Sequence, residues 1–106
     1  PCLLGRMKFV QMIEFETDRI DDMRSVIEQA DQQAMGRDGG PTHRLVLQDR
    51  SNPRRFFVVL EFASAEDARR NSEAPQTART AEQLAAMCTS GPSFTDCDVR
   101  EMTDLK

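Results

Sequence analysis

The segment 55–62 reads RFFVVLEF and is apolar in both phases of a two-residue alternation. Successive side chains of a strand point to opposite faces of the sheet. One face would therefore carry Phe56, Val58, Leu60 and Phe62. The other face would carry Phe57 and Val59, and it turns polar only at Glu61. Because a strand with one face in water alternates apolar and polar residues, we predict that both faces of this strand are covered.

Three further segments are predicted to be strands, namely residues 7–16, 43–50 and 93–102. The first of them, MKFVQMIEFE, is rich in strand-forming residue types. A turn containing Asn52-Pro53 joins the second strand to residues 55–62. The last segment is less apolar than the others, so we place it at an edge of the sheet.

The residues after the first strand predict an amphipathic helix. Thr17 or Asp18 can cap its start, and Gly36 ends it. Acidic residues in its first turn suit the helix dipole. Its apolar residues recur at steps of three and four and form one stripe: Ile20, Met23, Ile27, Ala30 and Ala34.

The residues between the third and fourth strands predict a second helical region with a break in it. Ser64 can cap its start, again with acidic residues in the first turn. Pro75 cannot continue the helix, and Thr77 or Thr80 can restart it. The apolar stripe after the break consists of Ala81, Leu84, Ala85 and Cys88. The tripeptide SGP at residues 90–92 ends the region.

The resulting order is β-α-β-β-α-β, without internal repeats. It predicts an α+β, ferredoxin-like fold, in which a four-stranded antiparallel sheet carries its helices on one face. We assign residues 7–106 to this single domain and residues 1–6 to an N-terminal extension that precedes Met7. Helices on one face leave the other face of the sheet open.

We assign the more apolar phase of each strand to the helix side. That set consists of Phe9, Gln11, Ile13, Phe15, His43, Leu45, Leu47, Phe56, Val58, Leu60 and Phe62. The opposite set consists of Val10, Met12, Glu14, Arg44, Val46, Gln48, Arg50, Phe57, Val59 and Glu61. The opposite set is too apolar for a face in water, and an exposed patch of this kind marks an interface.

The simplest partner for the open face is a second copy, packed sheet against sheet with two-fold symmetry. We therefore predict a homodimer, and its interface residues are Met12, Glu14, Arg44, Val46, Phe57, Val59 and Glu61. Within it, Glu14 and Glu61 would meet Arg44 and Arg50. The assignment depends on register, because a shift of one residue exchanges the two faces of a strand.

Composition narrows the class of protein. The chain has 106 residues, 39% of them apolar and 30% charged, and a net charge of −4, which argues against nucleic-acid binding. It has no run of about 18 apolar residues that could span a membrane. Three widely spaced cysteines, Cys2, Cys88 and Cys97, and a single histidine match no common metal site. We expect no metal, reduced thiols and a cytoplasmic protein.

A ligand pocket is expected between the sheet and the helices, lined by Gln11, Ile13, His43, Leu45, Phe56 and Asn71. Gln11 and Asn71 could hydrogen-bond a ligand; the alternatives are a core amide for Gln11 and a helix C-terminal residue for Asn71. His43 is the candidate general base, because histidine exchanges protons near neutral pH. Its alternative is a solvated group at a strand start. The chain has no G-x-S-x-G motif, which argues against Ser-His-Asp catalysis.

Three stretches carry a resemblance to a known family: MKFVQMIEF at the start, VVLEFASAEDARRNSEAPQT in the middle and GPSFTDCDV near the end. With the order of elements, they resemble the dimeric α/β-barrel superfamily that includes the antibiotic biosynthesis monooxygenases, and more specifically its small actinobacterial members. The resemblance covers residues 7 to about 102. It implies a homodimer whose two sheets form a barrel, and a pocket in each subunit between sheet and helices.

The functional residues of that superfamily do not carry over well. Its quinone-forming monooxygenases use Asn, Trp and Tyr near the substrate, and this chain has no Trp and no Tyr. Its haem-degrading members use an Asn on the first strand, a Trp, and an axial His in the second helical region. Here the first strand offers Gln11 or Ile13, and residues 64–90 contain no histidine.

Three functions stay open from the sequence. The first is a small-molecule-binding homodimer that uses no cofactor, with monooxygenase-like or isomerase-like activity on a planar hydrophobic compound. The second is a non-catalytic accessory or regulatory dimer, which the lack of Trp and Tyr favours. The third is haem binding through His43.

Overall fold

The computed structural model describes residues 8–34 and 39–106. Its elements follow in the order β1 (Phe9–Glu16), α1 (Ile20–Ala34), β2 (His43–Asp49), β3 (Asn52–Phe62), α2 (Ala65–Glu73), α3 (Pro75–Ala85) and β4 (Ser90–Asp98). The strands form one antiparallel sheet in the order β2-β3-β1-β4. The predicted ferredoxin-like fold is confirmed, with β4 at an edge. The expected extension at residues 1–6 and Gly36 lie outside the described residues, as does the side chain of Ala34.

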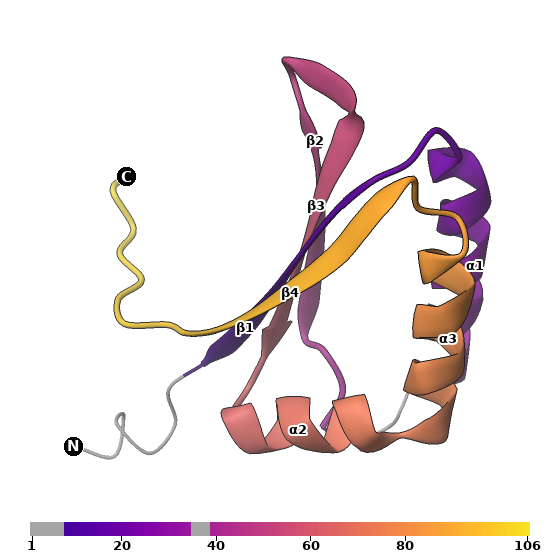
Figure 1. Cartoon of the computed structure of the whole chain (residues 1–106). Coiled ribbons are helices and arrows are strands. Elements are labelled where there is room, and N and C mark those ends of the chain that lie inside the picture. Colours follow the sequence, from indigo (N-terminus) through magenta and orange to yellow (C-terminus); the bar gives the residue numbers. More distant parts are fainter. Residues whose placement is uncertain (1–7, 35–38) are drawn as a thin grey trace.

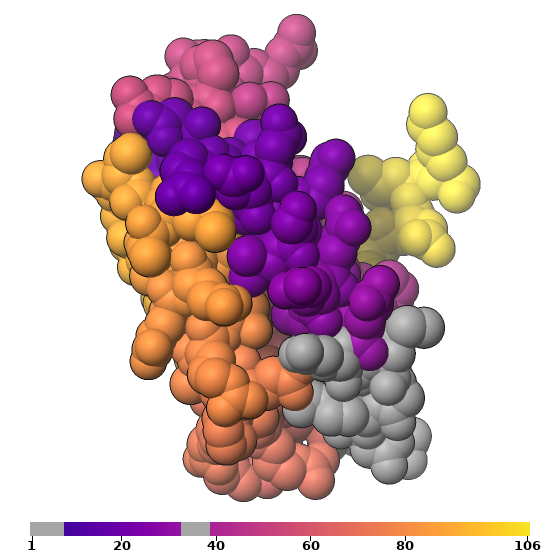
Figure 2. All heavy atoms as spheres, turned by 90° about the vertical axis from the view of Figure 1, so that its right-hand side faces the viewer, coloured from indigo at the N-terminus to yellow at the C-terminus, as the bar shows by residue number. Residues whose placement is uncertain are grey.

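The helices lie on one face of the sheet (Figure 1). α1 and α3 pack against each other side by side, and together they cover this face in the view of Figure 2. α2 lies across one end of the sheet and runs in a different direction from α3 (Figure 1). The C-terminal segment 99–106 lies on the opposite side of the sheet from the helices. Among the residues that the structure describes, no helix covers the second face of the sheet, which we call the open face.

The core lies between the two central strands and the helices. Phe15, Met23, Phe56 and Val58 form its buried cluster. Phe15 and Phe56 are ladder partners, and their rings stack with centroids 5.9 Å apart. The helix-side phase predicted for β1 and β3 is confirmed by this cluster.

Thr17 joins three parts of the fold. Its side chain is 1% exposed and follows directly after β1. The hydroxyl accepts a hydrogen bond of 3.0 Å from the N–H of Arg19, in the turn just before α1 begins. The first helical bond runs from the N–H of Met23 to the carbonyl of Arg19. The cap position of α1 is therefore Arg19, and not Thr17 or Asp18 as predicted. The Thr17 hydroxyl also donates a hydrogen bond of 2.7 Å to the carbonyl of Met87, which follows α3. One side chain thus fixes the first strand to the ends of two helices.

The second helical region divides at a single residue. Ser64 caps α2 as predicted, and its hydroxyl accepts a hydrogen bond of 3.1 Å from the N–H of Asp67. Ala74 then takes an extended conformation, and α3 begins at Pro75. The restart expected at Thr77 or Thr80 is therefore too late. Proline fits the first helical position because its fixed φ suits the helix and it has no N–H to satisfy there.

The fourth strand also begins earlier than expected, at Ser90. Gly91 lies within it at a φ of +82°, where the pairing between β1 and β4 shifts register between Glu14 and Glu16. A Cβ atom at this position would lie 2.9 Å from the carbonyl oxygen of Glu14. Both the backbone conformation and the close approach require glycine, so the residue marks an irregular strand start and not a helix end.

The face assignment of β2 is wrong and is corrected by its pairing with β3. Leu45 lies opposite Val59, and Val46 lies opposite Val58. Because ladder partners share a face, His43, Leu45 and Leu47 point to the open face, whereas Arg44, Val46 and Gln48 point to the helix side. The register, with a shift between Gln48 and Asp49 beside the turn, decides the face. Apolar content alone could not decide it.

The open face is more apolar than the sequence predicted. Arg44 and Val46 leave the expected interface set, and Leu45 and Leu47 join it. The apolar side chains that now share this face are Val10, Met12, Leu45, Leu47, Phe57 and Val59. Met12, Leu45 and Leu47 are 39%, 58% and 44% exposed in the single chain. A patch of this kind on a sheet with no helical cover is typical of an interface.

The ion pairs on the open face also differ from the expected ones. Glu14 pairs with Arg55 at 2.6 Å, and the Arg55 guanidinium lies 4.9 Å from the ring centre of Phe57. Glu61 pairs with His43 at 2.7 Å and with Lys8 at 3.6 Å. Arg44 cannot meet either glutamate, because it points to the other face of the sheet. The predicted pairing of Glu14 and Glu61 with Arg44 is therefore wrong.

Candidate ligand-binding cavity

A cavity of about 650 Å³ lies between the helix-side face of the sheet and the helices. Its walls come from β1, β2 and β3, from all three helices, and from Pro92 and Phe94 of β4. Cavities of roughly 300 to 1,000 Å³ hold small organic molecules in other proteins. The chain therefore has a cavity at the place where the pocket was predicted, between sheet and helices.

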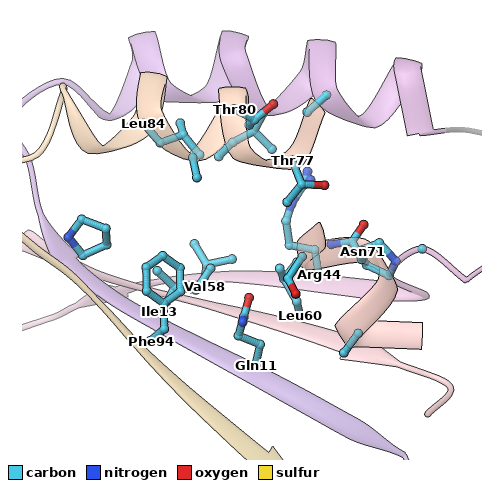
Figure 3. Close-up of a pocket in the computed structure, with 18 of the residues that line it drawn as sticks. Gln11, Ile13, Arg44, Val58, Leu60, Asn71, Thr77, Thr80, Leu84 and Phe94 are labelled. Atoms are coloured by element: carbon cyan, nitrogen blue, oxygen red, sulfur yellow. The ribbon is translucent and has the colours of Figure 1, made fainter. Parts of the chain in front are cut away.

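One end of the cavity is apolar. Ile13 of β1, Val58 of β3, Phe94 of β4 and Leu84 of α3 lie around it (Figure 3). Phe94 is the ladder partner of Ile13, so the two side chains stand next to each other on the same face. Burying a flat hydrocarbon surface against these side chains would stabilise its complex by the hydrophobic effect.

The other end of the cavity is polar. Gln11, Arg44, Asn71 and Thr77 lie there, from four different elements (Figure 3). The side-chain amide of Gln11 donates a hydrogen bond of 3.2 Å to Asp96, on the neighbouring strand. Together these side chains offer amide, hydroxyl and guanidinium donors at one place.

Asn71 owes its position to the break between the helices. It lies in the last turn of α2, and its carbonyl accepts a hydrogen bond of 3.2 Å from the N–H of Ala74. The chain then turns at Ala74, so that Thr77 in the first turn of α3 lies near Asn71 (Figure 3). The prediction that Asn71 lies beside a break made by Pro75 fits this geometry, and Asn71 lines the cavity.

Arg44 crosses from the sheet toward the helices. Its Nη1 donates a hydrogen bond of 2.5 Å to Oδ1 of Asp31 on α1. The Arg44 side chain is 31% exposed and that of Asp31 is 49% exposed. The pair therefore lies at the boundary between the cavity and solvent, with the arginine on the inner side.

His43, the predicted general base, lies at the edge of the cavity. It borders the cavity rim at the start of β2, but its ring lies on the open face of the sheet, with Nδ1 2.7 Å from Oε1 of Glu61. Burial alone would raise the pKa of the Glu61 carboxyl. Hydrogen bonds from His43 and Thr42 and the charge of Lys8 outweigh burial and hold the pKa of Glu61 below its usual value.

Of the other predicted ligand-binding residues, some line the cavity and some do not. Gln11, Ile13 and Asn71 line the cavity as predicted. Leu45 does not, because it points to the open face. Phe56 does not line the cavity either; it is buried in the core against Phe15.

Two further chemistries find no support among the described residues. Cys88 borders the cavity and donates a weak hydrogen bond to the carbonyl of Leu84 at 3.4 Å. Burial raises the pKa of the Cys88 thiol, so it is a poor nucleophile. In the described ranges, no group of three His, Cys, Asp or Glu side chains could hold a metal ion.

The sequence analysis missed Arg44, Thr77 and Phe94 as cavity residues. Arg44 was placed on the wrong face. Phe94 carried a signal, since it is the one large apolar residue in an otherwise small and polar fourth strand. Thr77 was considered only as a helix start. Its place in the cavity depends on where α3 begins.

Comparison with known proteins gives fold relatives and no close sequence relative. A candidate antibiotic biosynthesis monooxygenase from Nitrosomonas europaea is 15% identical, with 93% of this chain and 96% of that chain covered and a TM-score of 0.74. A second such candidate, from Deinococcus radiodurans, is also 15% identical, with 92% and 98% covered and a TM-score of 0.74. SnoaB, a cofactor-independent oxygenase from Streptomyces nogalater, is 16% identical, with 90% and 95% covered and a TM-score of 0.75.

No protein-family model matches the chain. No curated protein matches its sequence. The structural matches cover nearly the whole length of both chains, which establishes the fold. Because their sequence identities are low, they establish nothing beyond the fold. The resemblance predicted from the sequence, to antibiotic biosynthesis monooxygenase-like proteins, is confirmed at this level. In the described residues, no helix has both the length and the apolar character needed to cross a bilayer.

Proposed function

We propose that the protein is a homodimer that binds one planar hydrophobic small molecule in the cavity of each subunit. The observation that carries this proposal is the division of the 650 Å³ cavity into an apolar end and a polar end. Apolar walls give affinity for a flat molecule, and a few converging polar groups fix its orientation.

The reaction that suits this site is oxidation of a planar ketone by O₂ without a cofactor. SnoaB, which shares the fold, is a cofactor-independent oxygenase. In such chemistry, the ring loses a proton to water, and the electron-rich anion that remains reacts with O₂. The side-chain amides of Gln11 and Asn71 are the groups in the cavity that could stabilise the negative oxygen of that anion.

The runner-up function is a binding module without turnover. The chain has no Trp and no Tyr, and its one histidine is engaged by Glu61 on the open face of the sheet. The cavity therefore offers donors for an anion, whereas the imidazole at its rim is engaged by Glu61 and not aimed at a ligand. The same binding site serves both functions, and a turnover measurement separates them.

Haem binding through His43 is the least supported alternative. His43 lies at the cavity rim, and its imidazole is directed toward Glu61 on the open face of the sheet. We expect that haem titration gives no sharp Soret band that disappears in His43→Ala. A band that depends on His43 would replace the proposed function.

The homodimer forms through the open face of the sheet. Met12, Leu45, Leu47 and Val59 give that face its apolar character. Burying them against the same surface of a second copy would contribute favourable free energy at about 25 cal/mol per Å² of apolar surface. A cytoplasmic location is part of this proposal and rests on the thiols: Cys88 and Cys97 are free, and Cys2 lies outside the described residues.

Anthrone, a planar tricyclic ketone, is the probe for both functions. Its oxidation consumes one O₂ and yields one anthraquinone and one water, so an oxygen electrode and absorbance follow the same step. Binding is measured as a rise in melting temperature, which any ligand selective for the folded state must cause. We expect a rise with the wild-type protein, reduced in Asn71→Ala and Gln11→Ala. Gln83→Ala is the control, because Gln83 is an exposed amide on α3 outside the cavity.

The outcomes separate the candidates. Binding with O₂ uptake above the protein-free rate, lost in Asn71→Ala, supports the oxygenase. Binding without uptake supports the non-catalytic module. If neither anthrone nor other flat aromatic probes shift the melting temperature, the cavity does not bind this class of ligand and both functions are wrong.

A further inference from the structure

We propose that the ligand of the cavity is an acid, and that Arg44 binds its carboxylate. This inference rests on the proposed binding function and narrows its ligand to a planar hydrophobic carboxylic acid. It starts from the corrected face of β2, which brings an arginine to the polar end of an otherwise largely apolar cavity. The Arg44 side chain is 31% exposed, so part of its guanidinium faces solvent and part faces the cavity, where a bound anion can reach it.

The side chain of Arg44 reaches into the space between the sheet and the helices. In Figure 3 it lies between Leu60 on the sheet and Thr77 on α3. Both of these residues line the cavity. A guanidinium between the sheet and α3 can therefore contact a ligand that lies along the sheet with its ring system toward Ile13 and Phe94.

Asp31 does not use up the binding capacity of Arg44. The hydrogen bond between them engages Nη1, whereas a guanidinium carries five N–H donors in a planar fork. That fork matches the two oxygens of a carboxylate, which makes arginine the preferred partner for planar acids. Asp31 is half-exposed, so water screens its charge and it competes only weakly with an acid inside the cavity.

The neighbours of Arg44 add hydrogen-bond donors of the same kind. Asn71 offers a side-chain amide and Thr77 a hydroxyl at the same end of the cavity. Thr77 also lies in the first turn of α3, where the positive end of the helix dipole favours a negative charge. The cap residue of α3 is Ala74, whose methyl group cannot accept hydrogen bonds from the first turn. The polar end is therefore suited to an anion in both charge and hydrogen bonding.

The apolar end of the cavity determines which ring system the ligand can have. Ile13, Phe94 and Leu84 offer flat apolar walls without a charge of their own. A fused aromatic ring of two or three members with one carboxylate would place its rings there and its charge at Arg44. 2-Naphthoate represents this class, and 2-naphthamide is its neutral counterpart of nearly the same shape.

Isothermal titration with three probes tests the proposal. We expect 2-naphthoate to bind the wild-type dimer about tenfold or more tightly than 2-naphthamide, because a hydrogen-bonded ion pair is formed only with the acid. 2-Naphthylmethylammonium, the probe of opposite charge, should bind most weakly. Binding of 2-naphthoate should weaken as salt is added, and binding of 2-naphthamide should not.

Variants assign the effect to one side chain. Arg44→Met keeps the apolar stem, and it should abolish the preference for the acid, so that 2-naphthoate loses far more affinity than 2-naphthamide. Arg44→Lys keeps the charge without the fork and should retain part of the preference. Asp31→Asn frees Arg44 from its partner and should tighten 2-naphthoate binding several-fold. Arg69→Met is the control, since Arg69 pairs with Glu66 and Glu73 on the exposed side of α2 and does not line the cavity.

The failure of this inference can be told from the failure of the proposed function. If acid and amide bind equally and Arg44→Met changes neither, the cavity binds small molecules but Arg44 is not an acid-binding residue. If the ammonium probe binds most tightly, Asp31 is the anchor and the inference is overturned. If none of the probes binds, the inference falls together with the proposed binding function.

Discussion

Leu45 lies directly opposite Val59 in the ladder between β2 and β3, and both side chains point to the face that the helices leave uncovered. Leu47 repeats this arrangement opposite Phe57. The edge strand thus continues the apolar patch of the central strands. Val46, between the two leucines, points to the helix side of the sheet.

This alternation gives a matched test of the dimer. Leu45→Glu should yield a monomer in light scattering, because it puts a charge into the predicted interface. Wild-type protein should give about twice the chain mass of 12.0 kDa. Val46→Glu changes a residue of similar exposure, 47% against 58%, on the opposite face of the same strand, and it should stay dimeric. A monomeric wild type would contradict the dimer, and a dimeric Leu45→Glu would place the interface elsewhere.

Thr17 gives a prediction about stability. Thr17→Val keeps the shape of the side chain but leaves the carbonyl of Met87 and the N–H of Arg19 without their hydroxyl partner. We expect a loss of about 1 to 3 kcal/mol in the free energy of unfolding, measured by urea denaturation. Thr17→Ser retains the hydroxyl and should lose clearly less. Equal losses in the two variants would show that the methyl group, and not the hydroxyl, is what matters.

Substitutions at Gly91 and Gly40 give a second matched comparison, of stability. Gly91→Ala forces a side chain onto a φ of +82° and brings its Cβ within 2.9 Å of the Glu14 carbonyl, so we expect a loss of at least about 1 to 2 kcal/mol. Gly40→Ala meets no atom within 4 Å and should change stability by less than about 0.5 kcal/mol. Thermal unfolding of both variants at the same pH checks the difference. A neutral Gly91→Ala would mean that β4 starts differently from the described strand.

Glu61 gives a pH dependence with a defined sign. Its pKa in the folded protein is lowered from an ordinary value of 4.5: burial opposes this shift, and the bonds from His43 and Thr42 and the charge of Lys8 outweigh it. A lowered pKa means that the folded state favours the ionised form. The resulting stabilisation is fully present above the unfolded pKa and is lost as the pH falls through the folded pKa. The melting-temperature difference between wild type and Glu61→Gln should therefore shrink as the pH falls below about 4.5. A difference that grows on acidification would contradict the prediction.

The local pattern of the sequence was sufficient for the order of elements and for the two central strands. Phe15 and Phe56 belong to the more apolar phase of their strands, which only Gln11 interrupts in β1. Both strands have neighbours on each side, so the phase facing the helices follows from hydrophobic content. Ser64 could be identified as a cap because its hydroxyl needs only the backbone three residues ahead. Such features depend on interactions within a few residues of the chain.

The tertiary structure decided which side chains of β2 point to the helices, because the sequence pattern favoured neither phase of that strand. In β2 the leucine phase and the Arg44–Val46 phase both contain apolar residues, and the strand lies at an edge, so content could not choose between them. The choice was made by the ladder with β3, which is a contact between chain segments.

Arg44 shows the consequence for the candidate site. Its place at the polar end of the cavity depends on that ladder, on Asp31 of α1 and on the start of α3 at Pro75. The residue types of the site are in the sequence, and only the packing of sheet against helices brings them together, because they come from elements that are far apart along the chain.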